Sequence, residues 1–365
     1  MSFETVKKNF GFGCMRLKMK GDKVDYDEFN KMIDTFIDAG FNYFDTAHGY
    51  IDGKSETAIR DCLAKRYNRE DFVLANKLSD WYFERQEDIV PLFESQLELC
   101  GVEYFDFYLF HCLTRNSYPK HKECNSFEIV KKLKEEGKVK HIAMSFHDTA
   151  DVLDMILTEQ PCIEAVQLQI NYLDFDDPGV QSKACYDVAV KHGKKVIVME
   201  PVKGGVLVNL PDKAAKVLDD LKGGSYASYA LRYAASYPDV FMVLSGMGDM
   251  DMMKDNINTF KDFAPLNQDE LKATDRVRQI IREVRQIPCT ACNYCAEVCP
   301  LGIPISELFS VRNRFLSAKI TFGEAKETFP KDKPKACDCI KCGACEGVCP
   351  QNIGIREELE KISKM

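Results

Sequence analysis

Two runs near the end of the chain carry four regularly spaced cysteines each, with a proline behind the last. CTACNYCAEVCP starts at Cys289, and CDCIKCGACEGVCP, which starts at Cys337, repeats the pattern. Nine of the sixteen cysteines of the chain fall between Cys289 and Cys349. In a reducing compartment, clustered thiolates at regular spacing are metal ligands rather than disulfide partners. The two runs therefore predict a metal-binding module.

The spacing C-x₂-C-x₂-C-x₃-C-P is that of bacterial two-cluster ferredoxins, in which the fourth cysteine of each run ligates the other cluster. We therefore expect two [4Fe–4S] clusters in a bacterial-ferredoxin-like domain. The first ligand set is Cys289, Cys292, Cys295 and Cys349, and the second is Cys339, Cys342, Cys345 and Cys299. Cys337 is left over, either spare or an alternative ligand. Two alternatives stay open, namely zinc and clusters that are structural and redox-silent.

A second group of reactive side chains lies at the ends of apolar runs in the first third of the chain. Asp45 and Tyr50 lie in FDTAHGY, Lys77 ends DFVLANK and His111 ends FYLFH. The sequence between residues 10 and 262 alternates strand-like and helix-like segments. The expected strands are 11–17, 41–46, 71–77, 104–111, 139–145, 163–171, 194–201 and 239–246. The expected helices are 26–39, 54–66, 87–100, 125–136, 148–158, 180–192, 223–236 and 251–260.

Eight alternations of this kind predict an α/β protein with a (β/α)₈ TIM barrel. The strands read as continuous apolar runs, as expected when both faces of a parallel sheet are buried. A doubly wound open sheet is disfavoured, because GFGCMR lacks the third glycine of a dinucleotide-binding turn. The carboxyl ends of barrel strands meet at one mouth, so Asp45, Tyr50, Lys77 and His111 are expected to lie together. We expect a barrel over residues 1–262, a helical linker over 263–287 and the two-cluster domain over 288–365.

Composition excludes several classes of protein. The chain has 365 residues, of which 45% are apolar and 29% charged, with a formal charge of −8. No basic block indicates nucleic-acid binding. The longest apolar runs are strand-sized, which argues against a membrane span. MSFETVKKNF lacks the apolar core of a signal peptide, so a cytoplasmic location is expected.

The stretches FDTAHGY, LANK, LFH, GKVKHIAMS and VQLQIN resemble the aldo-keto reductase family over about residues 5–262. With its cysteine-rich tail, the chain resembles the ferredoxin-fused branch of that family. The resemblance implies a (β/α)₈ barrel, an oxidoreductase, and a catalytic tetrad on Asp45, Tyr50, Lys77 and His111. A phenol has an ordinary pKa of about 10, and a nearby ammonium lowers it. Lys77, oriented by Asp45, is expected to lower the pKa of Tyr50. Tyr50 would then protonate a carbonyl oxygen that His111 holds by a hydrogen bond.

The resemblance also implies cofactor-binding positions at the later strand ends. Ser145 and Gln167 match the residues that hold a nicotinamide carboxamide, but Phe146, followed by His147, stands at the family's asparagine. Met199, in VMEPVKGG with Pro201, replaces the stacking tyrosine. Neither Gly246 nor Met252 supplies the basic side chain that grips a 2′-phosphate.

Asn256, which the family uses on adenine, is retained. Two glycine-containing segments follow the seventh and eighth strands, where barrels commonly bind phosphate. They are Lys203, Gly204 and Gly205, and Ser245, Gly246 and Met247 with the glycine that follows. The expected cofactor is NAD(P)H or FMN. A flavin would explain the clusters better, because it converts between hydride and single electrons.

The leading hypothesis is an oxidoreductase that reduces a carbonyl, or an activated C=C bond, of a small molecule. Hydride would come from NAD(P)H or a reduced flavin, and the clusters would exchange electrons with ferredoxin or another redox protein. One alternative is an electron-transfer subunit whose barrel is a docking scaffold. Another is a plain NAD(P)H carbonyl reductase with a structural iron–sulfur cap.

Overall fold

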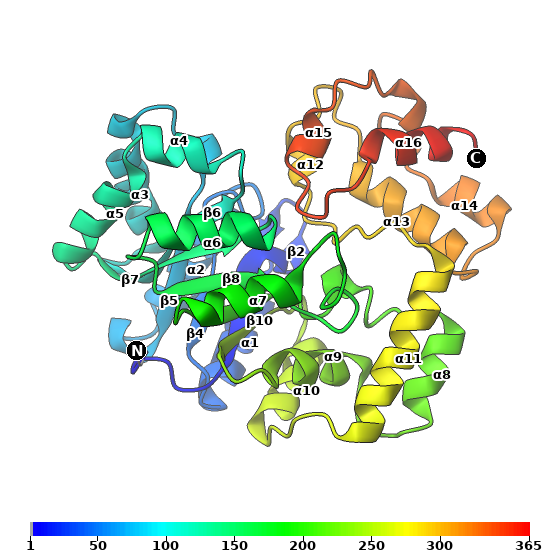
Figure 1. Cartoon of the computed structure of the whole chain (residues 1–365), viewed down its shortest axis with the longest axis horizontal. Coiled ribbons are helices and arrows are strands. Elements are labelled where there is room, and N and C mark those ends of the chain that lie inside the picture. Colours follow the sequence, from blue (N-terminus) through cyan, green and yellow to red (C-terminus); the bar gives the residue numbers. More distant parts are fainter. Residues whose placement is uncertain (1–2) are drawn as a thin grey trace. The chain divides into compact units, whose positions relative to one another are not determined.

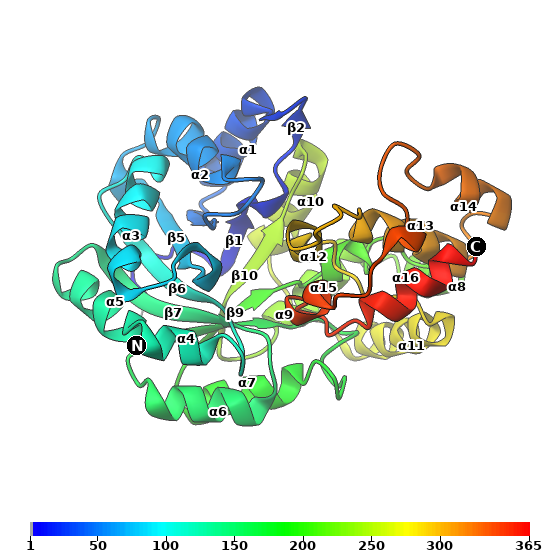
Figure 2. The same cartoon turned by 90° about the horizontal axis from the view of Figure 1, so that it is seen from above.

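Eight parallel strands close into a barrel in the computed structural model, which describes residues 3–365 (Figures 1 and 2). Residues 1 and 2, which the predicted barrel domain included, lie outside the described residues. Around the barrel the strands follow the order β1-β10-β9-β8-β7-β6-β5-β4, and β1 pairs with both β10 and β4. The strands are β1 Phe10–Gly13, β4 Tyr43–Asp45, β5 Val73–Leu78, β6 Phe105–Leu113, β7 Val139–Phe146, β8 Ala165–Gln169, β9 Lys195–Met199 and β10 Val240–Gly246. The predicted (β/α)₈ barrel is confirmed.

Helices follow the barrel strands along the chain. They are α1 Tyr26–Asp38, α2 Lys54–Ile59, α3 Gln86–Cys100, α4 Tyr118–Glu123, α5 Ser126–Glu135, α6 Ala150–Glu159, α7 Ser182–Lys191, α8 Asp212–Asp219, α9 Tyr226–Ala235 and α10 Met250–Lys261. Three further elements add to the predicted alternation. They are α4, α8 and the hairpin of β2 Met19–Lys20 with β3 Lys23–Val24. α1 begins where the Asp25 side chain accepts a hydrogen bond from the Glu28 N–H, which satisfies an unpaired donor of the first turn.

The inward faces of the strands fill the barrel with apolar side chains. This core comprises Phe3, Tyr43, Val73, Ala75, Phe107, Leu109, Ala143, Ala165, Ile197, Met242 and Leu244. Side chains of a strand alternate between its two faces, so the next inward position on each strand lies one layer closer to the carboxyl ends. That layer begins with Asp45 after Tyr43 and Lys77 after Ala75.

The chain divides into two compact units. The first unit contains the chain up to Pro201 together with Ala230–Pro265, and the second contains Val202–Tyr229 together with Leu266–Met365. The segment between β9 and α9 therefore belongs with the cysteine-rich part. The predicted linker is mostly one helix, α11 Gln268–Val284, which packs against α8 within the second unit.

The second unit is built from short helices and loops that enclose the cysteine runs. After α11 come α12 Tyr294–Glu297, α13 Ile305–Leu316, α14 Phe322–Thr328, α15 Ala344–Gly347 and α16 Ile355–Ser363. Its core is rich in isoleucine and includes two of the cysteines, Cys295 and Cys345. None of the helices within residues 3–365 combines the length and apolar character that crossing a membrane requires.

Candidate active site and cysteine sites

The predicted catalytic side chains occupy the layer directly beyond the apolar core of the barrel. Asp45 ends β4, Lys77 lies in β5 and His111 in β6, each two residues after a core side chain. Tyr50 comes from the loop between β4 and α2 and is almost fully buried. The structure therefore brings together the four residues named from the sequence.

A buried ion pair stands beside the phenol. Lys77 Nζ lies 2.6 Å from Asp45 Oδ1 and 2.8 Å from the Thr46 carbonyl oxygen, to both of which it donates. The same Nζ is 4.8 Å from the centre of the Tyr50 ring. Burial lowers the pKa of Lys77, but Asp45 and Tyr50 more than offset this and leave it above its ordinary value. Lys77 therefore holds a positive charge next to Tyr50.

The Tyr50 hydroxyl is a weaker acid than the sequence predicts. Burial raises its pKa to about 12, and the charge of Lys77 only partly opposes this. Lys77 lowers the pKa of Tyr50 as expected, but the pKa stays above its ordinary value, because removing the phenolate from water costs more than one ammonium returns. Tyr50 is therefore a neutral phenol at physiological pH, ready to donate a proton.

His111 is also neutral. Burial, followed by the charges of Lys77 and the neighbouring histidines, lowers its pKa well below the ordinary value. Its Nδ1 lies 2.6 Å from Ser79 Oγ, and its ring is 6.1 Å from that of Tyr50. When Ser79 donates to Nδ1, the hydrogen of His111 is on Nε2. Sequence reasoning missed Ser79, although it stands two residues after Lys77, where a continued strand alternation points to the same face.

The three aromatic residues after β5 separate into different roles. Trp81 is 41% exposed and its ring lies 5.0 Å from that of His111. Tyr82 packs edge-on against His48. Phe83 is buried and packs against His121. Of the three, Trp81 is thus the residue whose ring lies against His111.

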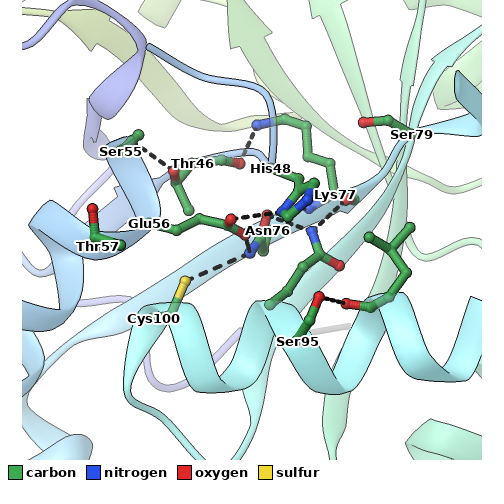
Figure 3. A network of polar contacts seen from close by, with 12 residues as sticks. Thr46, His48, Ser55, Glu56, Thr57, Asn76, Lys77, Ser79, Ser95 and Cys100 are labelled. Carbon is green, nitrogen blue, oxygen red and sulfur yellow. Dashed lines mark hydrogen bonds and ion pairs between the residues drawn. The ribbon is translucent and has the colours of Figure 1, made fainter. Parts of the chain in front are cut away.

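A network of buried polar side chains fixes the backbone of Lys77 from outside the barrel (Figure 3). Asn76 Oδ1 accepts from the Lys77 N–H at 2.8 Å, and Gln96 Nε2 donates to the Lys77 carbonyl at 2.9 Å. Asn76 Nδ2 in turn donates to the fully buried Glu56 carboxylate, which lies 2.8 Å from His48 Nδ1. Helices α2 and α3 therefore position Lys77, a role that the sequence pattern did not reveal.

Two of the expected cofactor-binding side chains lie on neighbouring strands. Ser145 of β7 and Gln167 of β8 are paired in register. Ser145 Oγ accepts from the Cys112 N–H at 2.8 Å, whereas the buried Gln167 Oε1 has no hydrogen-bond partner within residues 3–365. A buried amide oxygen of this kind is costly unless something donates to it. Gln167 therefore fits a cofactor that offers an N–H group.

The remaining expected positions in the first unit lie near these strand ends. His147 follows β7, and burial lowers its pKa to about 4, so that its ring is neutral. Met199, which ends β9, is half-buried, and Pro201 is buried. These placements leave the cofactor contacts of His147, Met199 and Pro201 as predictions.

The end of β10 carries a second group of expected residues. Asn256 Nδ2 of α10 donates to Ser245 Oγ at 3.0 Å. Gly246 is exposed and Met247 is buried. A methyl group added at Gly246 would lie 3.3 Å from Arg16 Cδ, so Arg16, from the loop after β1, brings a cation to a place where the local sequence has none. Its guanidinium is also 3.8 Å from the Glu200 carboxylate.

Lys203, Gly204 and Gly205 belong to the second unit, where their observed contacts are with the cysteine loops. Lys203 Nζ donates to Gln351 Oε1 at 3.2 Å, and a methyl group at Gly204 would lie 2.4 Å from the Thr290 carbonyl oxygen. A phosphate contact for these three residues stays a prediction.

The cysteines gather into the two sets predicted from the spacing. One cavity is lined by Cys289, Cys292, Cys295 and Cys349. The other is lined by Cys299, Cys339, Cys342 and Cys345. Burial and then the neighbouring thiols, that of Cys349 among them, raise the pKa of Cys295 to about 12. Cys337 is exposed and lines neither cavity. Four thiols around each cavity, with the fourth contributed by the other run, are the donor set that [4Fe–4S] clusters take.

Comparison with known proteins identifies both parts of the chain. Residues 9–279 match the aldo/keto reductase family, and residues 288–354 match a 4Fe-4S dicluster domain. The chain belongs to the aldo/keto reductase family. It is an oxidoreductase of that family with a C-terminal dicluster domain.

Relatives named as oxidoreductases and solved structures of aldo-keto reductases resemble much of the chain. The aldo/keto reductase chain is 22% identical to the uncharacterized oxidoreductase YqkF of Bacillus subtilis (strain 168), over 72% of this chain and 90% of that protein. It is 26% identical to the aldo-keto reductase str7 of Strobilurus tenacellus, over 66% and 71%. The aldo-keto reductase AKR11C1 of Bacillus halodurans shares the fold with a TM-score of 0.62 and 24% identity, over 74% and 91%. An aldo-keto reductase of Klebsiella pneumoniae in complex with NADPH gives a TM-score of 0.61 and 19% identity, over 75% and 95%.

Within this aldo/keto reductase barrel, the arrangement combines a neutral phenol, a buried ammonium beside it and a neutral imidazole. Such a site can give a proton to an oxygen atom and stabilise the phenolate that remains.

Proposed function

We propose that the protein reduces the carbonyl group, or an activated C=C bond, of a small molecule, with Tyr50 as the proton donor. Lys77 Nζ, held 2.6 Å from Asp45 beside the buried Tyr50 ring, is the observation that carries this proposal. As the substrate carbon accepts a hydride, its oxygen takes the Tyr50 proton. Lys77 then stabilises the phenolate until solvent reprotonates it. His111 orients the oxygen through Nε2, and Trp81 contributes an apolar wall.

The residues at the ends of β7 to β10 fit a hydride-carrying cofactor. Gln167 offers a buried, unpartnered amide oxygen, which an N–H of either a nicotinamide carboxamide or a flavin ring satisfies. Ser145 lies beside it, and Arg16 brings a cation to Gly246 for a phosphate. NAD(P)H and reduced FMN both supply hydride when bound.

The two cysteine sets fit two [4Fe–4S] clusters, which supply single electrons. We propose that these clusters exchange electrons with ferredoxin or another redox protein. A flavin in the barrel would then convert two single-electron transfers into one hydride.

The first experiment is anaerobic purification, followed by quantification of iron, sulfide and released flavin. About eight iron atoms per chain together with flavin would support a flavin enzyme supplied with electrons through its clusters. Eight iron atoms without flavin would assign hydride transfer to NAD(P)H and leave the electron exchange without a converter.

The second experiment tests the proton donor. Tyr50→Phe should lower the reduction of an aromatic aldehyde by about 10²-fold or more, with the cluster absorption unchanged. Tyr172→Phe is the matched control, because it removes a buried barrel hydroxyl that has no hydrogen-bond partner within residues 3–365. Full activity in Tyr50→Phe would refute the mechanism.

A second candidate function is an NAD(P)H carbonyl reductase whose clusters only stabilise the fold. The inclusion of Cys295 and Cys345 in the core of the second unit favours it. It predicts that carbonyl reduction with NAD(P)H survives serine substitution at Cys292 and Cys342. Loss of all turnover, with rapid cluster reduction by ferredoxin, would instead indicate an electron-transfer subunit.

A further inference from the structure

The two cysteine runs are near copies in sequence, but their surroundings differ. Thr290 follows the first cysteine of one run and Ile340 follows that of the other. Thr290 is 2% exposed and Ile340 is 64% exposed. Gln351 and Leu301 occupy another matched pair of positions, each directly after a Cys-Pro. Another segment of the chain therefore covers the first cavity at Thr290, whereas the second cavity is open at the matched position, Ile340.

The segment Lys203–Gly204 provides this cover. The Gly204 backbone has a φ of +59° and lies so close to Thr290 that a methyl group would be 2.4 Å from its carbonyl oxygen. Only glycine combines that φ with so close an approach. Beside it, Lys203 is 2% exposed and donates to Gln351 Oε1 at 3.2 Å. The Lys203 ammonium thus lies against the cavity-lining residue Gln351, and the adjoining Gly204 lies against the cavity-lining residue Thr290.

We propose that Lys203 raises the reduction potential of the cluster held by Cys289, Cys292, Cys295 and Cys349 relative to that of the other cluster. This inference rests on the proposed presence of two clusters. Four thiolates give a [4Fe–4S] group a net negative charge, and reduction adds one electron to it. A buried ammonium nearby stabilises the reduced form, because little water lies between them to screen the charges.

The cations at the second cavity are exposed to solvent. Arg356, which lines this cavity, has a side chain that is 47% exposed. Lys341 follows Ile340, but its side chain is 63% exposed and paired with Glu360. Water screens both of these charges. Lys203 therefore distinguishes the two clusters, and electrons that arrive at the open cluster, where Cys342 is exposed, move preferentially to the covered one.

A redox titration followed by electron paramagnetic resonance tests this inference on the full chain with its clusters. Lys203→Met keeps the length and burial of the side chain but removes its charge. For one of the two clusters, the ratio of reduced to oxidised cluster at a given potential should fall about tenfold. For one electron, that corresponds to about 59 mV toward lower potential. The other step should stay in place. Lys203→Arg should retain the wild-type position, and Lys341→Met is the matched control, with little effect on either step.

Two further variants identify the cluster concerned. In a Cys342→Ala background the shift should persist, because the covered cluster remains. Gly204→Ala, which forces the segment away from Thr290, should reproduce the shift even if Lys203→Met does not fold. Equal shifts in Lys203→Met and Lys341→Met, or none in Lys203→Met and Gly204→Ala, would overturn the inference. A chain without about eight iron atoms would instead refute the proposed presence of two clusters.

Discussion

At the residue scale, the proposed mechanism assigns one requirement of proton transfer to Tyr50 and the other to Lys77. Tyr50 must hold its proton until hydride arrives, and burial ensures this by raising its pKa to about 12. Lys77 must stabilise the phenolate that remains after the proton leaves, which it does as a cation held in place by Asp45. A strongly lowered phenol pKa would have left the site without a proton to give.

The reverse reaction, alcohol oxidation, needs the phenolate and so reports the pKa of Tyr50. Because that pKa is raised, oxidation should keep rising with pH through pH 9 without a plateau. Lys77→Met removes the opposing cation and raises the pKa further, and each unit lowers the phenolate fraction tenfold at a given pH. The pH profile of kcat for oxidation of an aromatic alcohol should therefore move to higher pH in Lys77→Met. An unchanged profile would contradict the role of Lys77.

Gln167 and Gln96 provide a matched pair of buried amides. Gln167 Oε1 has no partner within residues 3–365, whereas Gln96 bonds to Asn76, to the Lys77 carbonyl and to the Tyr108 hydroxyl. Gln167→Met should stabilise the barrel by about 1 kcal/mol and weaken cofactor binding, while Gln96→Met should destabilise it by a similar amount or more. Urea unfolding and cofactor titration measure both effects. Equal destabilisation by both variants would show that Gln167 is a structural residue.

At the element scale, the short helix α4 carries a buried histidine, His121, in an aromatic environment. Both ring nitrogens of His121 are buried without a hydrogen bond within residues 3–365, and the ring packs among Phe83, Phe110 and Phe127. Burial, with Lys120 adding to it, lowers the pKa of His121 to about 3. The folded protein therefore keeps this ring neutral where an unfolded chain, with an ordinary pKa of about 6.5, takes up a proton.

The free energy of unfolding should fall as the pH falls below about 6.5, because His121 then binds a proton in the unfolded chain but not in the folded protein. The contribution is lost progressively down to about pH 3, at about 1.4 kcal/mol for each pH unit. His121→Leu should remove this part of the pH dependence. Urea unfolding at pH 7.5 and 5.5, followed by the fluorescence of Trp81, the single tryptophan, compares the two proteins in the barrel. An identical loss of stability in both would mean that His121 is already paired in solution.

Elements that depend on local pattern could be predicted, and contacts between distant segments could not. The eight strands and the convergence of Asp45, Lys77 and His111 follow from alternating apolar runs, since a strand that ends on a polar inward residue directs it to the barrel mouth. The cysteine sets follow from their spacing. Three contacts join segments that are separated in the chain. They are Arg16 with Gly246, Glu56 with Asn76, and Lys203 with Gln351. Nothing in the local sequence of any of these residues marks its partner.

At the scale of the whole molecule, the chain between β9 and α9 is not a simple barrel connection. Val202–Tyr229 carries α8 and belongs to the unit that holds the cysteines. α8 packs on α11, and Lys203 and Gly204 pack on the cysteine loops. The dicluster unit thus takes part of its structure from within the reductase sequence.

Removal of the clusters should therefore affect the two units unequally. The core of the second unit is made of isoleucines and leucines around Cys295 and Cys345, and further cysteines pack against it. Bound clusters would link four cysteines each across this small core, so their binding energy contributes to its folding. The barrel has its own apolar interior and no such dependence.

Anaerobic chelation of iron should therefore speed amide hydrogen exchange across residues 286–365. It should also speed exchange in Lys203–Gly205, because this segment packs on Thr290 and Gln351. Strands β5 and β6 should stay protected, and the fluorescence of Trp81 should not change. Unaltered exchange in residues 286–365 would show that the apolar core suffices without metal. Faster exchange in β5 and β6 as well would show that the barrel depends on the clusters.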